Sequence, residues 1–339
     1  MRTKGQKIQR MTQNMYIYGA EEGEMHVFFC IFATCNIAKQ KGNSVMKLSI
    51  LIPTYNFDCS GLVATLATQL PDDCEVVVGD DCSTEEGVRN RLQGLQGEYV
   101  RLIRPERNLG SAGMRNMLCR EAKGEYLLYV DCDAIVEDGN FVARYLAECD
   151  GCVVCGTVKH PDRLPSPRQS LRWRYEKAME VRFTAEEANK SSYQHFRTFH
   201  FLVPRSVMLA VPFNEAVKSS GYEDLLFGKQ LANMGIPVRH TEIAATNGDI
   251  ETNDVFLQKT ERHMRTLYQM RQEIGAYSTL LTFCSRLERH HLSRPLRFLF
   301  HILRPLLRWN LQGAHPSVRL FQFYKLGYFL DLETANRKN

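Results

Sequence analysis

Short apolar runs alternate with helical stretches along the chain from Lys47 onward. The runs predict strands at 48–52, 75–79, 99–103 and 126–130, and helices are expected between them at 60–70, 85–95 and 111–122. Strands that are apolar on both faces and separated by helices are typical of a parallel sheet that helices cover on both sides. The first half of the chain is therefore predicted to be a doubly wound, mostly parallel α/β unit.

The rest of the chain has other patterns. Residues 1–45 are predicted to be a weakly structured extension, and Met46, directly before the first strand, is a candidate biological start. The segment 151–253 combines a Pro-rich loop, an amphipathic helix, a strand near 199–203 and an acidic helix start. The segment 254–339 is predicted to be helical and contains many arginines.

Composition excludes several classes of protein. Of the 339 residues, 44% are hydrophobic and 24% are charged, as in an ordinary folded protein. The net charge of +5 is too small to indicate nucleic-acid binding, so no nucleic-acid partner is expected. The eleven cysteines are scattered in apolar segments, which suits a reducing cytosol. No apolar run reaches the roughly 18 residues of a membrane span, so the chain is not expected to cross a bilayer. With the cysteine usage, this favours a cytoplasmic location.

Polar and acidic residues follow three of the predicted strands. Ligands of open α/β sheets bind outside the carboxyl ends of the strands, where these residues would meet. The residues are Pro53-Thr54-Tyr55-Asn56, Asp80-Asp81-Cys82-Ser83 and Asp131-Cys132-Asp133. A dinucleotide site would need a Gly-x-Gly-x-x-Gly turn after the first strand, and a phosphate-loop enzyme would need Gly-Lys-Ser/Thr. Neither motif is present.

Asp131 and Asp133 lie two residues apart at a strand end, so in an extended chain both carboxylates would point the same way. Hard cations such as Mg²⁺ or Mn²⁺ are held by one or two carboxylates together with substrate phosphates. The alternative is a strand-to-helix turn in which Asp133 or Asp138 caps a helix.

Two further groups are candidates for ligand binding. Asp81 could accept hydrogen bonds from a base edge or a ribose hydroxyl, although Ser83 and Thr84 could simply cap the next helix. Arg115 stands near the start of a helix among small residues that would allow a ligand to approach the backbone. A close contact between that helix and the sheet, with a solvated arginine, is the alternative.

Glu223 and Asp224 open an apolar-periodic helix. Acids in a first turn stabilise the helix dipole without any catalytic role. A catalytic base is the sharper hypothesis.

Five motifs in this order resemble glycosyltransferase family 2, whose members have the A-type nucleotide-diphospho-sugar transferase fold. They are LSILIPTYN, VVVGDDCST, NLGSAGMRN, GEYLLYVDCDAIV and GYEDLLFGKQL, within residues 47–260. The resemblance implies an inverting transfer of a sugar from a nucleotide-diphospho-sugar to an acceptor hydroxyl. It also implies a donor site in which Pro53, Thr54, Tyr55 and Asp81 surround the nucleotide. Asp131 and Asp133 would form the motif that binds Mg²⁺ or Mn²⁺. Asp224 would be the catalytic base, with Glu223 beside it. Arg115 would help to stabilise the departing diphosphate.

The chain departs from the family pattern in three places. Where many relatives have a histidine that completes the metal site, this chain has Asn247, and His240 seven residues earlier is the candidate ligand. Tyr222 stands where relatives often have His or Trp, and His200 stands where many have Asn. Both differences are expected to affect the choice of acceptor.

The resemblance divides the chain into a nucleotide-sugar-binding half at 46–150, an acceptor-binding half at 151–253 and a basic helical segment at 254–339. A glycan or lipid-linked acceptor, in the synthesis of cell-surface polysaccharide or lipopolysaccharide, is the expected partner. A sugar-nucleotide pyrophosphorylase would instead have a Gly-rich loop with Arg and Lys after the first strand, where this chain has PTYN. A catalytically inactive sugar-binding module is the non-enzymatic alternative.

An amphipathic basic helix is predicted between Pro295 and Leu307. Its apolar residues at helical spacing are Leu296, Leu299, Phe300, Leu303 and Leu307, and Arg297, Arg304 and Arg308 share another face. Such a helix favours peripheral binding to an anionic membrane surface. The alternative is that the apolar residues pack on the catalytic domain and the arginines are solvated.

Overall fold

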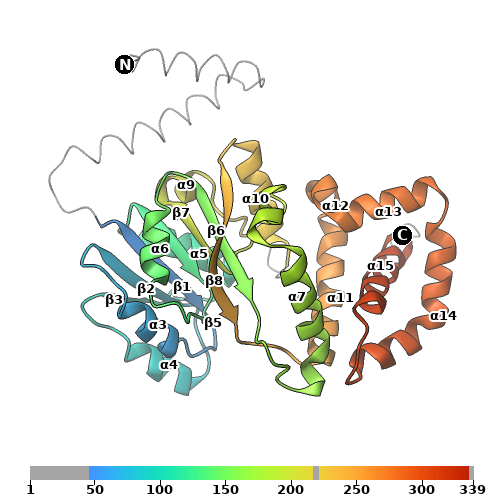
Figure 1. Cartoon of the computed structure of the whole chain (residues 1–339), viewed down its shortest axis with the longest axis horizontal. Coiled ribbons are helices and arrows are strands. Elements are labelled where there is room, and N and C mark those ends of the chain that lie inside the picture. Colours follow the sequence, from blue (N-terminus) through green and yellow to red (C-terminus); the bar gives the residue numbers. More distant parts are fainter. Residues whose placement is uncertain (1–45, 217–220, 336–339) are drawn as a thin grey trace, which may run out of the picture. The chain divides into compact units, whose positions relative to one another are not determined.

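The computed structural model describes residues 46–216 and 221–335, and the predictions for 1–45 concern residues outside these ranges. Within them, eight strands form one mixed sheet (Figure 1). Its order is β3 (Val100–Ile103), β2 (Cys74–Asp80), β1 (Leu48–Thr54), β4 (Tyr126–Val130), β7 (His200–Pro204), β6 (Val153–Lys159), β8 (Val238–Asn247) and β5 (Ala134–Ile135).

The four strands predicted in the first half are confirmed, and they pair in parallel as β3-β2-β1-β4. The sheet then continues with β7, which is antiparallel to β4 and to β6, while β6 and β8 are parallel to each other. The short β5 pairs antiparallel with the end of β8, with Ala134 opposite Asn247. The predicted α/β class is therefore correct, with antiparallel strands added in the second half.

Helices cover both faces of this sheet because alternate strand residues point to opposite sides. On one face, Ile50 and Ile52 pack in a core with residues of α3 (Ser60–Ala67), α4 (Glu86–Gln93) and α6 (Phe141–Ala147). On the other face, Leu51 packs in a second core with residues of α5 (Gly110–Glu121), α9 (Arg205–Ala210) and α10 (Glu223–Asn233). The helices predicted at 60–70, 85–95 and 111–122 are confirmed as α3, α4 and α5.

A third core joins the helices of the second half. It includes residues of α7 (Ser170–Arg182), α11 (Asn253–Gln269), α12 (Arg271–Ile274), α13 (Thr279–Arg289), α14 (Ser293–Gln312) and α15 (Val318–Ala335). The helices α7 and α11 lie between the sheet and α13 to α15 (Figure 1). The short helix η2 (Gly275–Tyr277) contacts α12 and α13, whereas the short helix α8 (Ala185–Asn189) packs against β8 of the sheet. Within the described ranges, no helix combines the length and the apolar content of a membrane span.

The predicted amphipathic helix is α14, and it continues through Pro305. Most of the apolar residues that were predicted to face a membrane pack inward instead. Phe300 and Leu307 are buried, and Leu296 and Leu303 pack partly buried against the third core. A different apolar set lies at the surface of the helix, with exposed fractions between 57% and 78%: Phe298, Ile302, Leu306 and Trp309.

The position of α10 depends on a glycine. A Cβ atom on Gly228 would stand 2.2 Å from the carbonyl oxygen of Tyr193, so α10 lies directly against this backbone. We expect Gly228→Ala to lower the free energy of unfolding by about 1–3 kcal/mol or more, as overpacking does in a core. Urea denaturation would measure the loss.

Gly61 is the matched control, because it is also helical but has nothing within 4 Å of its Cβ position. Gly61→Ala should stabilise the protein by about 0.5–1 kcal/mol through its higher helix propensity. A Gly228→Ala protein as stable as wild type would contradict the close packing of α10.

Candidate active site

A pocket of about 350 Å³ lies where β1, β2 and β4 end. These neighbouring strands are parallel, so their carboxyl ends reach the same edge of the sheet. The structure brings together at this pocket all six residues that were predicted to bind the donor: Pro53, Thr54, Tyr55, Asp81, Arg115 and Asp131. Asp133, predicted as a metal ligand, also lines it.

Asp81 connects the end of β2 to the start of α5. Its two carboxylate oxygens accept hydrogen bonds from the backbone N–H groups of Leu109 at 2.6 Å and Gly110 at 2.9 Å. Gly110 has a φ of 76°, which a residue with a side chain rarely adopts. Burial raises the pKa of Asp81, against the effect of these two hydrogen bonds. The carboxylate therefore holds the loop before α5 in place at the pocket.

Arg115 and Asp131 form an ion pair in the wall of the pocket. The Nη2 atom of Arg115 donates to Oδ1 of Asp131 at 2.8 Å, and Nη1 donates to the hydroxyl of Ser111. Arg115 is only 4% exposed, and its buried Nε has no acceptor among the described residues. The hydroxyl of Tyr129 donates to the carbonyl oxygen of Arg115 at 2.9 Å, which fixes this turn of α5 on the sheet.

Asp133 is a carboxylate in an acidic and largely desolvated part of this edge. Burial and the charges of Asp131 and Asp249 raise its pKa to about 6. Asp249, which the sequence analysis missed, lines the same pocket. It follows β8, and the N–H of Gly248 donates to the carbonyl oxygen of Asp133 at 3.3 Å. Asp249 would have been a candidate because it follows a strand end, if the full length of β8 had been predicted from the sequence.

These residues fit a hard divalent cation. A group of three or more His, Cys, Asp or Glu ligands is not found in the part of the chain that the structure describes. Magnesium and manganese nevertheless need only one or two carboxylates when substrate phosphates supply further oxygens. Asp133 and the second oxygen of Asp131 provide such a pair, and a cation would relieve the repulsion that raises the pKa of Asp133.

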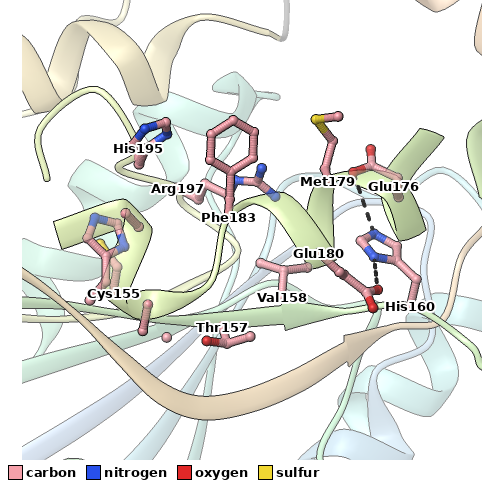
Figure 2. A pocket seen from close by; sticks show the side chains of 14 residues that line it. Cys155, Thr157, Val158, His160, Glu176, Met179, Glu180, Phe183, His195 and Arg197 are labelled. Atoms are coloured by element: carbon pink, nitrogen blue, oxygen red, sulfur yellow. Dashed lines mark hydrogen bonds and ion pairs between the residues drawn. The ribbon is translucent and has the colours of Figure 1, made fainter. Parts of the chain in front are cut away.

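His240, which was predicted as a metal ligand, does not line this pocket, so the geometry gives that role no support. Asn247 is the β8 residue opposite Ala134, and His240 lies seven residues earlier on the strand, roughly 23 Å away at 3.3 Å per residue. His240 lines a separate, small pocket of about 40 Å³ with His160, Glu180 and Arg197, three residues that Figure 2 labels. Its Nε2 atom is 2.9 Å from the carbonyl oxygen of Ser192.

His200 is a core residue. It is 1% exposed, with Nδ1 2.6 Å from the hydroxyl of Tyr145 and Nε2 3.0 Å from the carbonyl oxygen of Thr157. Burial lowers its pKa to about 4, so the ring is neutral. The expected effect of His200 on acceptor choice has no support in this geometry, because both ring nitrogens are engaged inside the fold.

Glu223 and Asp224 begin α10 and have different environments. Glu223 is partly buried, which raises its pKa, but the charge of Arg115 and hydrogen bonds from the N–H groups of Gly221 and Tyr222 lower the pKa overall. Burial and the neighbouring Glu223 raise the pKa of Asp224 to about 6. Asp224 accepts one hydrogen bond, from the N–H of Leu225 at 2.7 Å. Asp224 is therefore the better proton acceptor of the two near neutral pH.

The electrostatic interactions join this helix start to the pocket. Glu223 raises the pKa of both Arg115 and Asp131, although burial has the largest effect on each. Arg115 also acts on Asp224. The pocket and the first turn of α10 thus form one charged site, which we call the candidate active site.

Comparisons with known proteins agree with this arrangement. Residues 49–209 match the profile of glycosyl transferase family 2. An uncharacterized glycosyltransferase of Haemophilus influenzae is 38% identical over 88 residues, which cover 25% of this chain and 29% of the relative. The poly(ribitol-phosphate) beta-N-acetylglucosaminyltransferase TarS of Staphylococcus aureus is 38% identical over 100 residues, covering 26% of this chain and 16% of the relative. The chain thus spans less than a third of the length of these two relatives.

One solved structure is similar along nearly the whole chain. It is the mannosyltransferase PcManGT of Pyrobaculum calidifontis, in complex with GDP-Man and Mn²⁺. The TM-score is 0.56 at 14% sequence identity, and the alignment covers 92% of this chain and 97% of the other. The likeness establishes the A-type glycosyltransferase fold.

Proposed function

Residues 49–209 belong to glycosyl transferase family 2, and on that basis we propose that the chain transfers a sugar from a nucleotide-diphospho-sugar to an acceptor hydroxyl, with inversion. The observation that carries the proposal is the convergence of Asp81, Arg115, Asp131 and Asp133 on one pocket at the sheet edge. Three separate segments supply these four residues, and all of them lie inside the family match.

The donor would occupy this pocket. Pro53, Thr54 and Tyr55 would contact the nucleotide, and Tyr55 is 49% exposed, so its ring is available for stacking. Arg115 would face the diphosphate. Its charge is fixed inside the protein, and the attraction between a buried cation and an anion becomes stronger as water is excluded. Asp131 and Asp133 would hold Mg²⁺ or Mn²⁺, which neutralises charge on a departing diphosphate.

Asp224 would take the proton from the acceptor hydroxyl. Its pKa of about 6 leaves it ionised at neutral pH yet more basic than an ordinary aspartate. Glu223 would remain ionised beside it, because its carboxylate accepts a hydrogen bond from the N–H of Gly221 and is attracted to Arg115. This division of roles gives one carboxylate for proton transfer and one for the placement of α10.

The first test of the base is Asp224→Asn. The variant should lower the rate of transfer by about 10² to 10⁴, the usual contribution of a positioned base, while nucleoside diphosphate still binds. In the wild type, kcat/KM should fall as pH decreases below about 6, because Asp224 takes up a proton there and can no longer accept one.

Glu223→Gln is the comparison for this test. It should retain a fall in kcat/KM at acidic pH, shifted to lower pH than in the wild type, because the charge of Glu223 helps to raise the pKa of Asp224. A wild-type profile that is flat from pH 5 to 8, or a larger loss of rate in Glu223→Gln than in Asp224→Asn, would show that Asp224 is not the base.

The metal has its own test. In the wild type, Mn²⁺ together with a nucleoside diphosphate should raise Tm, because ligands that bind only the folded state stabilise it. Asp133→Asn should remove the part of this shift that depends on Mn²⁺ and should abolish metal-dependent turnover of the donor. Asp138→Asn, which changes an aspartate outside the pocket, is the control. Full activity of Asp133→Asn, or of the wild type in excess chelator, would contradict the metal site.

The acceptor is proposed to be part of a cell-surface glycan. The relative TarS acts, by its name, on poly(ribitol-phosphate), and this supports an acceptor of the same general class. A place at the cytoplasmic face of a membrane would bring the enzyme to such an acceptor.

The surface of α14 supports membrane association. Phe298, Ile302, Leu306 and Trp309 follow spacings of four, four and three residues, so they share one face of the helix. Seven arginines and one acid, Glu288, lie between residues 286 and 319. Charge complementarity therefore favours an anionic lipid surface, on which each basic residue near the headgroups contributes about 1 kcal/mol.

The double variant Phe298→Ser and Trp309→Ser tests this interface. These side chains are 69% and 78% exposed, so their loss should leave the fold intact. The wild type should sediment with phosphatidylserine vesicles at low salt and less at high salt, while the variant should stay in the supernatant.

Val181→Ser is the matched control, because Val181 is 84% exposed on α7 and lies outside the arginine-rich segment. It should sediment like the wild type. Equal sedimentation of the wild type and the double variant would refute the membrane interface.

A further inference from the structure

A second pocket, of about 650 Å³, lies beside the start of α10 and is larger than the proposed donor pocket. We call it the helical pocket, because α13 and α15 contribute much of its lining. Tyr222 and Leu225, which flank Glu223 and Asp224 in the chain, form the part of the lining nearest to the proposed base.

The lining of the helical pocket is apolar and aromatic with a cationic group. Its rings and apolar chains include Phe183, Tyr277, Leu280 and Phe323. No carboxylate occurs among the described lining residues. The pocket therefore suits a molecule with an apolar body and a group that can pair with a cation.

That cation is Lys325 on α15. Its Nζ atom lies 4.6 Å from the ring centroid of Tyr175 and 5.0 Å from that of Phe321, and it is 3.4 Å from the Tyr175 hydroxyl. In the described residues no carboxylate is within ion-pair distance of it. Burial lowers its pKa to about 8, with Glu176 acting weakly in the opposite direction.

Two aromatic rings and one hydroxyl contact the ammonium group of Lys325, and Glu176 only partly offsets the effect of burial on its charge. An anion whose oxygens accept hydrogen bonds from an ammonium group in such surroundings would stabilise its charge. His195, the other lining residue that can become cationic, is held neutral at pH 7 because burial lowers its pKa. The anion would therefore sit at Lys325.

The helical pocket is also connected to the proposed base. Besides burial, the charge of Asp224 and the neighbouring Tyr175 raise the pKa of Tyr222. Tyr175 is the same residue that contacts Lys325. Tyr222 and Leu225 line the helical pocket on either side of Glu223 and Asp224 in the chain, so the pocket reaches the turn of α10 that carries the proposed base.

We propose that the helical pocket binds the acceptor, and that the acceptor is an amphiphile with a phosphate group that pairs with Lys325. The proposal rests on the proposed transferase function, because it takes Asp224 as the end of the acceptor path. A lysine ammonium is a compact charge that binds phosphate well, and the aromatic lining would contact the apolar or sugar portion.

The test uses three probes of different chemistry: n-octyl phosphate, n-octyl β-glucoside and inorganic phosphate. Isothermal titration calorimetry, below the micelle concentration, would give the Kd of each. Octyl phosphate should bind most tightly to the wild type. Lys325→Met should weaken octyl phosphate about 10- to 100-fold, the range expected for loss of a hydrogen bond to a charged group, and should leave octyl glucoside unchanged.

Two further variants complete the design. Lys325→Arg keeps the charge and should retain most of the octyl phosphate affinity. Lys190→Met, at an exposed lysine paired with Glu187 on α8, should bind like the wild type. Inorganic phosphate that binds as tightly as octyl phosphate would overturn the amphiphilic ligand. Equal affinity of Lys325→Met and wild type for octyl phosphate would overturn the assignment of Lys325.

Nucleoside diphosphate binding in the same samples separates this inference from the proposed function. Lys325→Met should bind the nucleoside diphosphate like the wild type, since Lys325 does not line the donor pocket. Failure of the wild type to bind any nucleoside diphosphate would contradict the transferase function but would not contradict a phosphate site at Lys325.

Discussion

The ion pair between Arg115 and Asp131 is the interaction on which the candidate active site depends. Arg115 is almost fully buried on α5, and Asp131 stands where β4 ends. A guanidinium buried without an anion would cost several kcal/mol, so α5 and the end of β4 are held in register. Glu223 adds a second negative charge near the same arginine, which also ties the start of α10 to the sheet edge. One buried cation thus positions the diphosphate region and the proposed base together.

Much of this site could be predicted from the sequence because it lies at the ends of parallel strands. The apolar runs that become β1, β2 and β4 are short and separated by helices, which is typical of a parallel sheet covered on both faces, and the residues that follow such strands share an edge. Asp81 and Asp131 were identified by that argument alone. The family resemblance was needed for Asp224, since an acid in a first helical turn has no distinctive local pattern.

The second half was less predictable, since its contacts join residues far apart in the chain. The ten residues of β8 run from Val238 to Asn247, and Asp249 follows the strand. Only the pairing of β8 with β5 shows which end of the strand reaches Asp133. In α14, apolar residues occupy two faces, and periodicity does not indicate which face packs. The third core selects the face that includes Leu303, and Phe298 is left at the surface.

The helix α10 belongs to two cores at once. Phe227 and Leu231 pack in the core of the sheet, whereas Leu226 packs with the C-terminal helices. The turn that carries Glu223 and Asp224 therefore cannot shift against one core without disturbing the other. As a consequence, the C-terminal helices are not an exchangeable module. A chimera that takes them from a relative would have to carry a compatible α10 as well, so the proposed acceptor pocket and the placement of the proposed base are expected to diverge together during evolution.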